Sequence, residues 1–313
     1  LLKKNNFYEK FFFSKEWSRK LIKTFNISTL VMDDSFFLSF NKNKNLVHIL
    51  KNHNKKVVLL PHTCHIFDFA EEKEIFSKIN FSNFYPDLIV CNEKRRNNMI
   101  SFGYNPTKVK NFGSARFSNE WINIHSKIVN SVNTNSSKKK LNIVVIDGTY
   151  NRHKRQSTLL NKLSHNIPNI EIIFRTHVRK NNKIEDIRSL LKLNNKILID
   201  FNTPTTNLIK NADIVIGTMS SILIEAFIFE KFLIFPTFLL NENNVKVYYK
   251  SRGFSFDCEN EEEVLNKIIL FDEYKKKINS KSRSDFIEEF VYGAKDQKLI
   301  LKNYSDYLLS TQI

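Results

Sequence analysis

Apolar runs alternate with segments of helical spacing along most of the chain, most clearly over residues 211–236, NADIVIGTMSSILIEAFIFEKFLIFP. Residues 214–218 form a continuous run of apolar or small side chains, which is typical of a parallel strand buried on both faces. Apolar residues at helical spacing then predict a helix from Ser221 to Lys231, and residues 232–236 predict the next strand. This stretch therefore predicts one strand, turn, helix and strand unit of a parallel sheet.

The same alternation occupies the rest of the second half. Strands are predicted over residues 141–148, 171–177 and 196–200, and helices over residues 155–167, 184–195 and 205–212. Such regular alternation favours a doubly wound parallel sheet. Further helices are predicted over residues 261–278 and 285–308.

The first half repeats the pattern. Its predicted elements are a helix over 7–25, a strand over 28–34, a helix over 36–53, a strand with its loop over 55–65, a strand, helix, turn and strand over 85–117, and a helix over 117–130. The polar run SVNTNSSKKK at 131–140 predicts a linker. We therefore expect an α/β protein with an N-terminal domain over residues 1–130 and a second domain from residue 141. An initial methionine is absent, which leaves open that the N-terminal domain lacks its first strand.

Composition narrows the class of protein. A length of 313 residues with 42% hydrophobic residues suits two domains that each bury a core. Three widely spaced cysteines favour a reducing compartment, and no secretory signal or membrane span is visible, so we expect a soluble cytoplasmic protein. The net charge of +17 suits nucleic acid, an anionic membrane surface or phosphorylated substrates. No nucleic-acid-binding motif is present, so we expect no nucleic acid partner and retain peripheral contact with the inner face of a membrane.

Two hydroxyls stand at the predicted start of the helix in the 211–236 stretch. A helix N-terminus presents unpaired backbone N–H groups and a positive dipole end, so Ser220 and Ser221 suit a phosphate. Glu225 follows one turn later on the face of Ser221, within reach of a ribose hydroxyl. The alternative is that both serines are only helix caps and Glu225 is a solvated helix residue.

The surroundings of these residues resemble a known group of proteins. Asp213, Ile216, Ser220 and Ser221 follow a D-x-x-I-x-x-x-S-S pattern, which resembles the donor-site segment of GT-B-type transferases, above all the CDP-glycerol glycerophosphotransferase-like and surface-carbohydrate families. The similarity extends over about residues 85–310. It implies two Rossmann-like domains facing a cleft, with a nucleotide-donor domain at 141–285 and residues 286–313 returning to the N-terminal acceptor domain.

Other loops carry the same resemblance. Arg116 ends a G-x-x-R turn that begins at Gly113, and the resemblance places its cation towards the domain boundary. Arg175 and His177 match an R-x-H motif whose basic residues hold donor phosphates. For both loops the alternative is an ordinary surface position. The donor-binding residues predicted by the spacing and the resemblance together are Gly148, Thr149, Arg175, His177, Thr218, Ser220, Ser221 and Glu225.

Residues 61–68 carry the candidate catalytic groups. They follow a predicted parallel strand, and ligands bind beyond the carboxyl ends of such strands. His62 and His65 with Cys64 permit a zinc site, but no fourth ligand is evident, so a general base is the better interpretation. The resemblance favours His62, with His65 and Asp68 as alternatives, and a purely structural histidine stays open. Asp33 and Asp34, which end the preceding strand, are interpreted as a turn and helix cap.

These observations predict a metal-independent transferase without a cofactor, which moves a sugar or polyol phosphate to an acceptor hydroxyl during surface-polysaccharide assembly. Its expected partners are a nucleotide-activated donor, for which the resemblance favours CDP or CMP, and a glycan or lipid-linked glycan acceptor. One alternative is a hydrolysing UDP-sugar 2-epimerase, which shares the fold. The other is an inactive partner protein that keeps the fold without donor binding.

Overall fold

The computed structural model describes residues 14–33, 45–77, 79, 81, 86–129, 140–146, 153–176, 184–240, 245–293 and 299–310. The described residues form two compact units. The N-terminal unit holds the residues up to His65, Ala70–Ile122 and those from Glu288 onward, and the C-terminal unit holds Ile66–Phe69 and Asn123–Ile287. Each unit contains a parallel sheet of its own.

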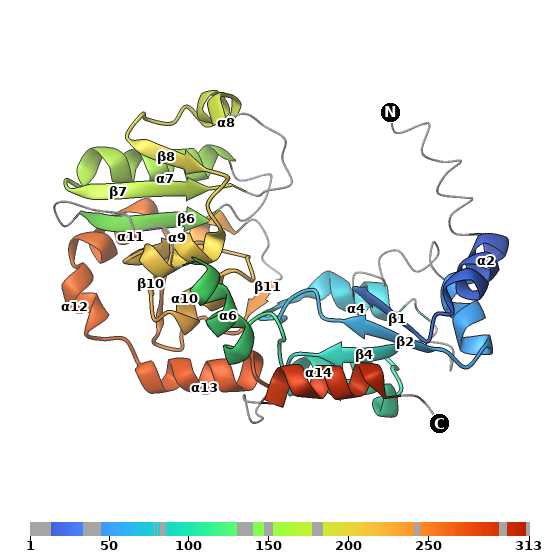
Figure 1. The fold of residues 1–313 in the computed structure, drawn as a ribbon. Helices are drawn as coiled ribbons and strands as arrows, with labels where there is room; N and C mark the ends of the chain where they lie inside the picture. Colours follow the sequence, from blue (N-terminus) through green and yellow to red (C-terminus); the bar gives the residue numbers. More distant parts are fainter. Residues whose placement is uncertain are drawn as a thin grey trace. The chain divides into compact units, whose positions relative to one another are not determined.

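A six-stranded parallel sheet forms the centre of the C-terminal unit, with the strand order β12-β10-β9-β6-β7-β8 (Figure 1). Along the chain the sheet begins in its middle at β6, grows outward through β7 and β8, and then continues on the other side of β6 with β9. This is the strand order of a dinucleotide-binding Rossmann sheet. Its strands are β6 (Leu141–Ile146), β7 (Ile170–Arg175), β8 (Ile197–Asp200), β9 (Ile214–Ile216), β10 (Phe232–Pro236) and β12 (Ser255–Cys258).

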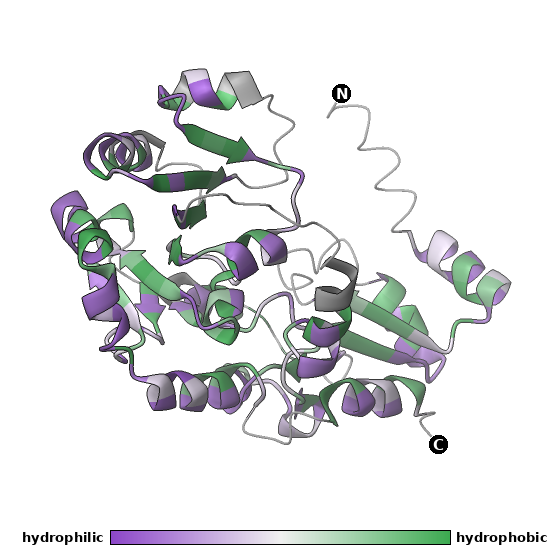
Figure 2. Ribbon diagram, turned by 60° about the vertical axis from the view of Figure 1, so that its left-hand side comes forward, coloured by the Kyte–Doolittle hydropathy of each residue, from purple (hydrophilic) through white to green (hydrophobic). Residues whose placement is uncertain are grey.

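Helices cover both faces of this sheet. On one face, α7 packs against α8 and α11 over the side chains of alternate strand residues such as Ile143 and Val145. On the other, α9 packs against α10 over the intervening residues such as Val144. The helices are α7 (His153–Asn166), α8 (Ile184–Leu191), α9 (Thr205–Asn211), α10 (Leu223–Ile228), α11 (Glu261–Ile269), α12 (Phe271–Lys275) and the 3-10 turn η2 (Thr237–Leu239). Burial on both faces explains why the central strands β6, β9 and β10 contain continuous apolar runs. Figure 2 colours hydrophobic segments such as these green.

The N-terminal unit contains a four-stranded parallel sheet in the order β1-β2-β4-β5. These four strands lie side by side in the order in which they occur along the chain. The reversal of strand order that marks a doubly wound sheet is therefore seen in the C-terminal sheet and not among these four strands. The strands are β1 (Thr29–Asp33), β2 (Lys56–Leu60), β4 (Asp87–Val90) and β5 (Val109–Asn111), and the helices are α2 (Lys15–Phe25), residues 45–52, α4 (Ala70–Ser77), α5 (Glu93–Ser101), the 3-10 turn η1 (Pro106–Lys108) and α14 (Ile300–Leu309). The predicted α/β class with parallel sheets is confirmed.

The C-terminal helix α14 is part of the N-terminal unit and is held there by polar contacts. The hydroxyl of Tyr304 donates to the carbonyl of Gly113 at 2.8 Å, and the hydroxyl of Tyr307 donates to Asp87 at 2.8 Å. The ammonium group of Lys56, which is only 4% exposed, donates to the carbonyl of Tyr307. Gly113 has φ +79°, as expected for a turn of unusual backbone angle.

Three segments carry the chain from one unit to the other. The helices α6 (Asn119–Val129) and α13 (Ser280–Phe290) each contain residues of both units. The third is β3 (Phe67–Phe69), which the sequence pattern did not predict and which lies within residues 1–130. It pairs in antiparallel register with β11 (Val245–Val247) of the C-terminal unit.

Two predicted elements differ in extent. The helix predicted from Ser221 begins only at Leu223 and ends at Ile228. The N–H groups of Leu223 and Ile224 donate to carbonyls three residues earlier, so a tighter turn precedes the helix. Glu230, at φ +56°, ends it in the left-handed conformation.

Candidate functional site

A small recess lies at the carboxyl ends of β6, β9 and β10. It is lined by Val145, Ile146, Gln156, Ile216, Gly217, Thr218, Pro236 and Leu239. β6 and β9 are the neighbouring strands at which the strand order reverses. In open α/β sheets, ligands bind beyond the carboxyl ends of the strands at this switch point. The recess therefore coincides with the position where the fold itself predicts a ligand.

Gly217 brings three elements close together at the recess. A Cβ atom at this position would lie 2.9 Å from Cδ2 of Leu223 and 3.3 Å from Cβ of Ile146. Both distances are shorter than an ordinary carbon contact. The missing side chain therefore allows β9 to pass close to β6 and to the start of α10.

The residues that follow β9 lie as the sequence placed them, after a strand and before a helix. Thr218 is buried, and its carbonyl accepts a hydrogen bond from the buried Tyr249 hydroxyl at 3.2 Å. The Ser220 hydroxyl accepts a hydrogen bond from the N–H of Ile222 at 3.4 Å, while Ser221 is partly exposed. Glu225 is not a solvated helix residue, because it is only 6% exposed.

Arg175 ends β7 and is held by a neighbouring strand. Its Nε donates to the Thr205 hydroxyl at 3.3 Å, and one terminal nitrogen donates to the backbone carbonyl and carboxylate of Asp200 at 3.1 and 3.2 Å. The side chain is 7% exposed. These contacts fix the guanidinium at the carboxyl edge of the sheet. Three predicted donor-binding residues, Gly148, Thr149 and His177, lie outside the described residues.

His62 contacts an aspartate at the carboxyl edge of the N-terminal sheet. Nδ1 of His62 lies 2.7 Å from Oδ2 of Asp33, the last residue of β1. Because a carboxylate only accepts, Nδ1 carries the proton and Nε2 is left as an acceptor. The two side chains are 51% and 48% exposed, so this pair is accessible to a substrate. A histidine oriented in this way by an aspartate can act as a general base.

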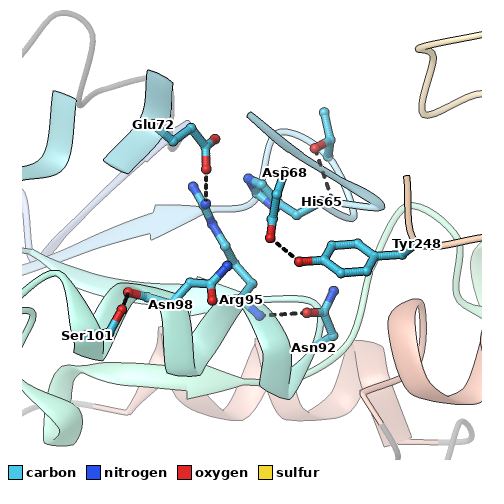
Figure 3. Close-up of polar contacts among 9 residues, drawn as sticks. His65, Asp68, Glu72, Asn92, Arg95, Asn98, Ser101 and Tyr248 are labelled. Carbon is cyan, nitrogen blue, oxygen red and sulfur yellow. Dashed lines mark hydrogen bonds and ion pairs between the residues drawn. The ribbon is translucent and has the colours of Figure 1, made fainter. Parts of the chain in front are cut away.

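The two alternative bases are in different surroundings (Figure 3). His65 is partly buried, adopts φ +49°, and its N–H donates to the Thr63 hydroxyl. Burial, reinforced by the positive charge of Arg95, holds the pKa of His65 well below its ordinary value. Asp68 accepts a hydrogen bond from the Tyr248 hydroxyl across the β3–β11 ribbon. His65 is therefore a weak base, and the Asp68 carboxylate is already engaged.

Arg95 is itself a buried cation of the N-terminal unit. Its guanidinium contacts the Glu72 carboxylate at 2.6 Å, and its side chain is 6% exposed (Figure 3). The Asn92 side chain accepts from the Arg95 N–H at 2.8 Å and donates to the carbonyls of Cys64 and Phe290. These contacts connect the loop after β2 to α5 and to the end of α13.

The remaining predicted site residue, Arg116, is exposed, and its guanidinium lies 5.1 Å from the centre of the Phe117 ring. Within the described ranges, no group of three or more His, Cys, Asp or Glu side chains is arranged to hold a metal ion. No described helix has both the length and the apolar character needed to cross a membrane.

The sequence interpretation missed Asp33 as the partner of His62. The sequence shows that Asp33 ends one predicted strand and that His62 lies two residues beyond the next. It does not show that these two strands are neighbours, which the structure establishes by pairing Asp33 with Leu60. Gln156 was also missed, although it occupies an apolar position in the helical pattern.

No protein-family model and no curated protein matches the chain. Solved structures do. UDP-GlcNAc 2-epimerase from Neisseria meningitidis, bound to UDP-GlcNAc, superposes with a TM-score of 0.61 at 13% identity, over 93% of this chain and 78% of that one. A glycosyltransferase from Rickettsia africae gives 0.54 at 14% identity, over 94% and 79%. HepE from Anabaena, in complex with UDP-glucose, gives 0.54 at 12% identity, over 93% and 81%.

These similarities extend over both halves of the chain and define its class as the GT-B fold of two Rossmann-like domains. At such low identity they show the fold alone. The neighbours include both a glycosyltransferase and a UDP-GlcNAc 2-epimerase, so this fold does not by itself define one activity.

Proposed function

We propose that this protein is a transferase that moves a sugar or polyol phosphate from a nucleotide-activated donor to an acceptor hydroxyl in cell-surface polysaccharide biosynthesis. The observation that carries the proposal is the recess at the switch point of the C-terminal sheet, which is where a Rossmann fold holds a nucleotide. The C-terminal unit then binds the donor and the N-terminal unit the acceptor.

On the donor side, charge develops on the departing phosphate during transfer. Backbone N–H groups before α10, the hydroxyls of Ser220 and Ser221, and the fixed guanidinium of Arg175 are the groups that we assign to stabilise it. Gly148, Thr149, His177, Thr218 and Glu225 remain the other proposed donor contacts. These N–H groups, hydroxyls and cations would take the place of a metal ion in stabilising the phosphate. The reaction as proposed therefore requires no metal.

On the acceptor side, we assign His62 as the general base. Its Nε2 removes the proton of the attacking hydroxyl, and Asp33 keeps the required tautomer and stabilises the imidazolium that forms. Asp33 acts through His62 and is a positioning residue. We prefer His62 to His65 and Asp68 because it is exposed and oriented, whereas His65 has a lowered pKa and Asp68 is engaged by Tyr248.

A thermal-shift panel of CMP, CDP, UDP and GDP without metal tests donor binding. A ligand at a hundred times its dissociation constant adds about 2.7 kcal/mol, which raises the melting temperature by several degrees. The resemblance of residues 211–221 favours a cytidine nucleotide, while the uridine nucleotides of the structural neighbours supply the competing outcome. A response to none of the four, from folded protein, would contradict the proposal and favour an inactive partner protein.

The variant Ser220→Ala with Ser221→Ala locates the binding site. We expect it to lose most of the nucleotide-induced shift while remaining folded, because lost cap-like bonds cost only about 1 kcal/mol. An undiminished shift would exclude these hydroxyls from the donor site.

A hydrolysing 2-epimerase is the second candidate, because a UDP-GlcNAc 2-epimerase is among the structural neighbours. Incubation with UDP-GlcNAc and no acceptor separates the two activities. An epimerase would convert the sugar nucleotide, whereas a transferase would leave it largely unchanged until an acceptor is added.

We further propose that the acceptor is a glycan or lipid-linked glycan and that the protein touches the inner membrane surface. The exposed side of α2 supports this, since Lys15, Arg19, Lys20 and Lys23 are exposed and Phe25 is 70% exposed. A basic helix face with an exposed aromatic suits anionic lipid. Sedimentation with phosphatidylserine vesicles, lost when the four basic residues are changed to Gln and absent with neutral vesicles, would support it.

A further inference from the structure

A buried amide oxygen in the recess has no hydrogen-bond partner among the residues that the structure describes. Gln156 belongs to α7 and is 3% exposed, and its Oε1 has no hydrogen-bond partner among the described residues. It also lines the recess at the switch point. An unpaired buried polar atom costs stability, so a residue that keeps one needs an explanation other than packing.

The position on the helix makes the choice of residue informative. Leu159, Leu160 and Leu163 follow Gln156 at spacings of three, four and seven, and all three are fully buried in the core of the sheet. Gln156 therefore occupies the first position of an apolar stripe. A leucine or methionine there would extend the core without an unpaired atom. The glutamine breaks the pattern at the end of the stripe that reaches the recess.

The chemistry of the unpaired atom indicates what it binds. An amide oxygen accepts hydrogen bonds, so its ligand must donate one. A phosphate at neutral pH offers mainly acceptors, whereas a hydroxyl group of the ligand can donate. We propose that Gln156 is a binding residue of the donor site, whose Oε1 accepts a hydrogen bond from a hydroxyl of the bound sugar nucleotide, either on the ribose or on the transferred group. This inference rests on the proposed function of the same recess.

Replacement by methionine tests the proposal, because Gln156→Met keeps the length of the side chain and removes both polar atoms. We expect the ligand-free variant to melt about 2–4 °C higher than the wild type, since the unpaired amide oxygen is gone. Its affinity for the sugar nucleotide should fall about tenfold by calorimetric titration. A merely structural glutamine would not produce these opposite effects.

Two further variants complete the design. Gln156→Glu keeps an acceptor oxygen, so it should bind the sugar nucleotide better than Gln156→Met even if it melts lower. Ser164→Ala, on the same helix, removes a hydroxyl that contacts the Asn161 carbonyl and Nδ1 of His165, both on its own helix, and should leave affinity unchanged. Titration with the nucleoside diphosphate alone locates the hydroxyl: an equal loss indicates the ribose, and a loss confined to the sugar nucleotide indicates the transferred group.

The outcomes separate the two proposals. If the wild type binds no nucleotide or sugar nucleotide, the proposed function and this inference both fail. If the wild type binds and Gln156→Met binds equally well, only the assignment of Gln156 is overturned. A lower melting temperature with unchanged affinity would show that the amide supports the fold.

Discussion

The close approach of β9 to β6 and α10 at Gly217 permits a quantitative test. In Gly217→Ala, the new Cβ would lie 2.9 Å from Cδ2 of Leu223 and 3.3 Å from Cβ of Ile146. Leu223 is fully buried, so its side chain has little room to rotate away, and the Cβ of Ile146 moves only with its strand. Overpacking of this kind costs about 1–3 kcal/mol.

The companion variant Leu223→Ala removes the methyl group that causes the closer contact. Alone it creates a cavity and should cost about 2–5 kcal/mol. Combined with Gly217→Ala, part of that cavity accommodates the added methyl group. The double variant should therefore be less destabilised than the two single effects predict, with a coupling of about 0.5–3 kcal/mol.

Urea unfolding measures this coupling if the two units are followed separately. Both tryptophans, Trp17 and Trp121, belong to the N-terminal unit, so their fluorescence serves as an internal control. Hydrogen exchange of the β6 and β9 amides reports on the C-terminal unit. Additive effects in those amides would refute the packing argument, as would a Gly217→Ala variant as stable as the wild type.

Three other predictions follow from single contacts. Because the folded pKa of His65 is depressed, the unfolded state binds more protons below about pH 6.5, so unfolding free energy should fall by up to about 1.4 kcal/mol per pH unit on acidification. His65→Asn, which tolerates the left-handed backbone, should show a shallower slope in melting experiments between pH 5 and 7, and an identical slope would contradict the assignment. Asp33→Asn should lower kcat about ten- to a hundredfold, because its amide favours the wrong tautomer of His62, with nucleotide affinity preserved; unchanged kcat would remove Asp33 from the mechanism. Tyr304→Phe leaves the buried Gly113 carbonyl without this donor and should destabilise the N-terminal unit by about 1–2 kcal/mol in urea, whereas a loss below 0.5 kcal/mol, on the same order as an exposed site, would indicate that water replaces the bond.

The elements of the C-terminal sheet were predictable because their signal is local. Burial on both faces requires continuous apolar runs, so Ile143–Ile146 and Ile214–Ile216 stand out without knowledge of the fold. The short strands β3 and β11 carry no such signal. Each is three residues long, and their pairing depends on a contact between residues far apart in the chain.

The site was predictable only in part. Spacing after a strand placed Ser220, Ser221 and His62 at carboxyl edges, and it was right that Glu225 belongs to the helix that follows. Spacing does not show which strands are neighbours, and so the partnership of His62 with Asp33 became visible only in the structure. The extent of α10 was wrong because a three-residue hydrogen-bonding pattern at Ser220 and Ser221 competes with the α-helix.

The β3–β11 ribbon also bears on how such a protein can evolve. The ring centres of Phe67 in β3 and Tyr249 lie 5.8 Å apart. A short segment from the first half of the chain is therefore part of the aromatic core of the C-terminal unit. A recombination event that replaced residues 141–285 from another lineage would bring a new β11 and a new aromatic cluster without the strand that matches them. We therefore expect hybrid libraries with a single breakpoint at 131–140 to contain fewer folded members than libraries in which residues 66–69 are exchanged together with the second half. Selection would then tend to pass on the two halves as one inherited unit, although each has a core of its own.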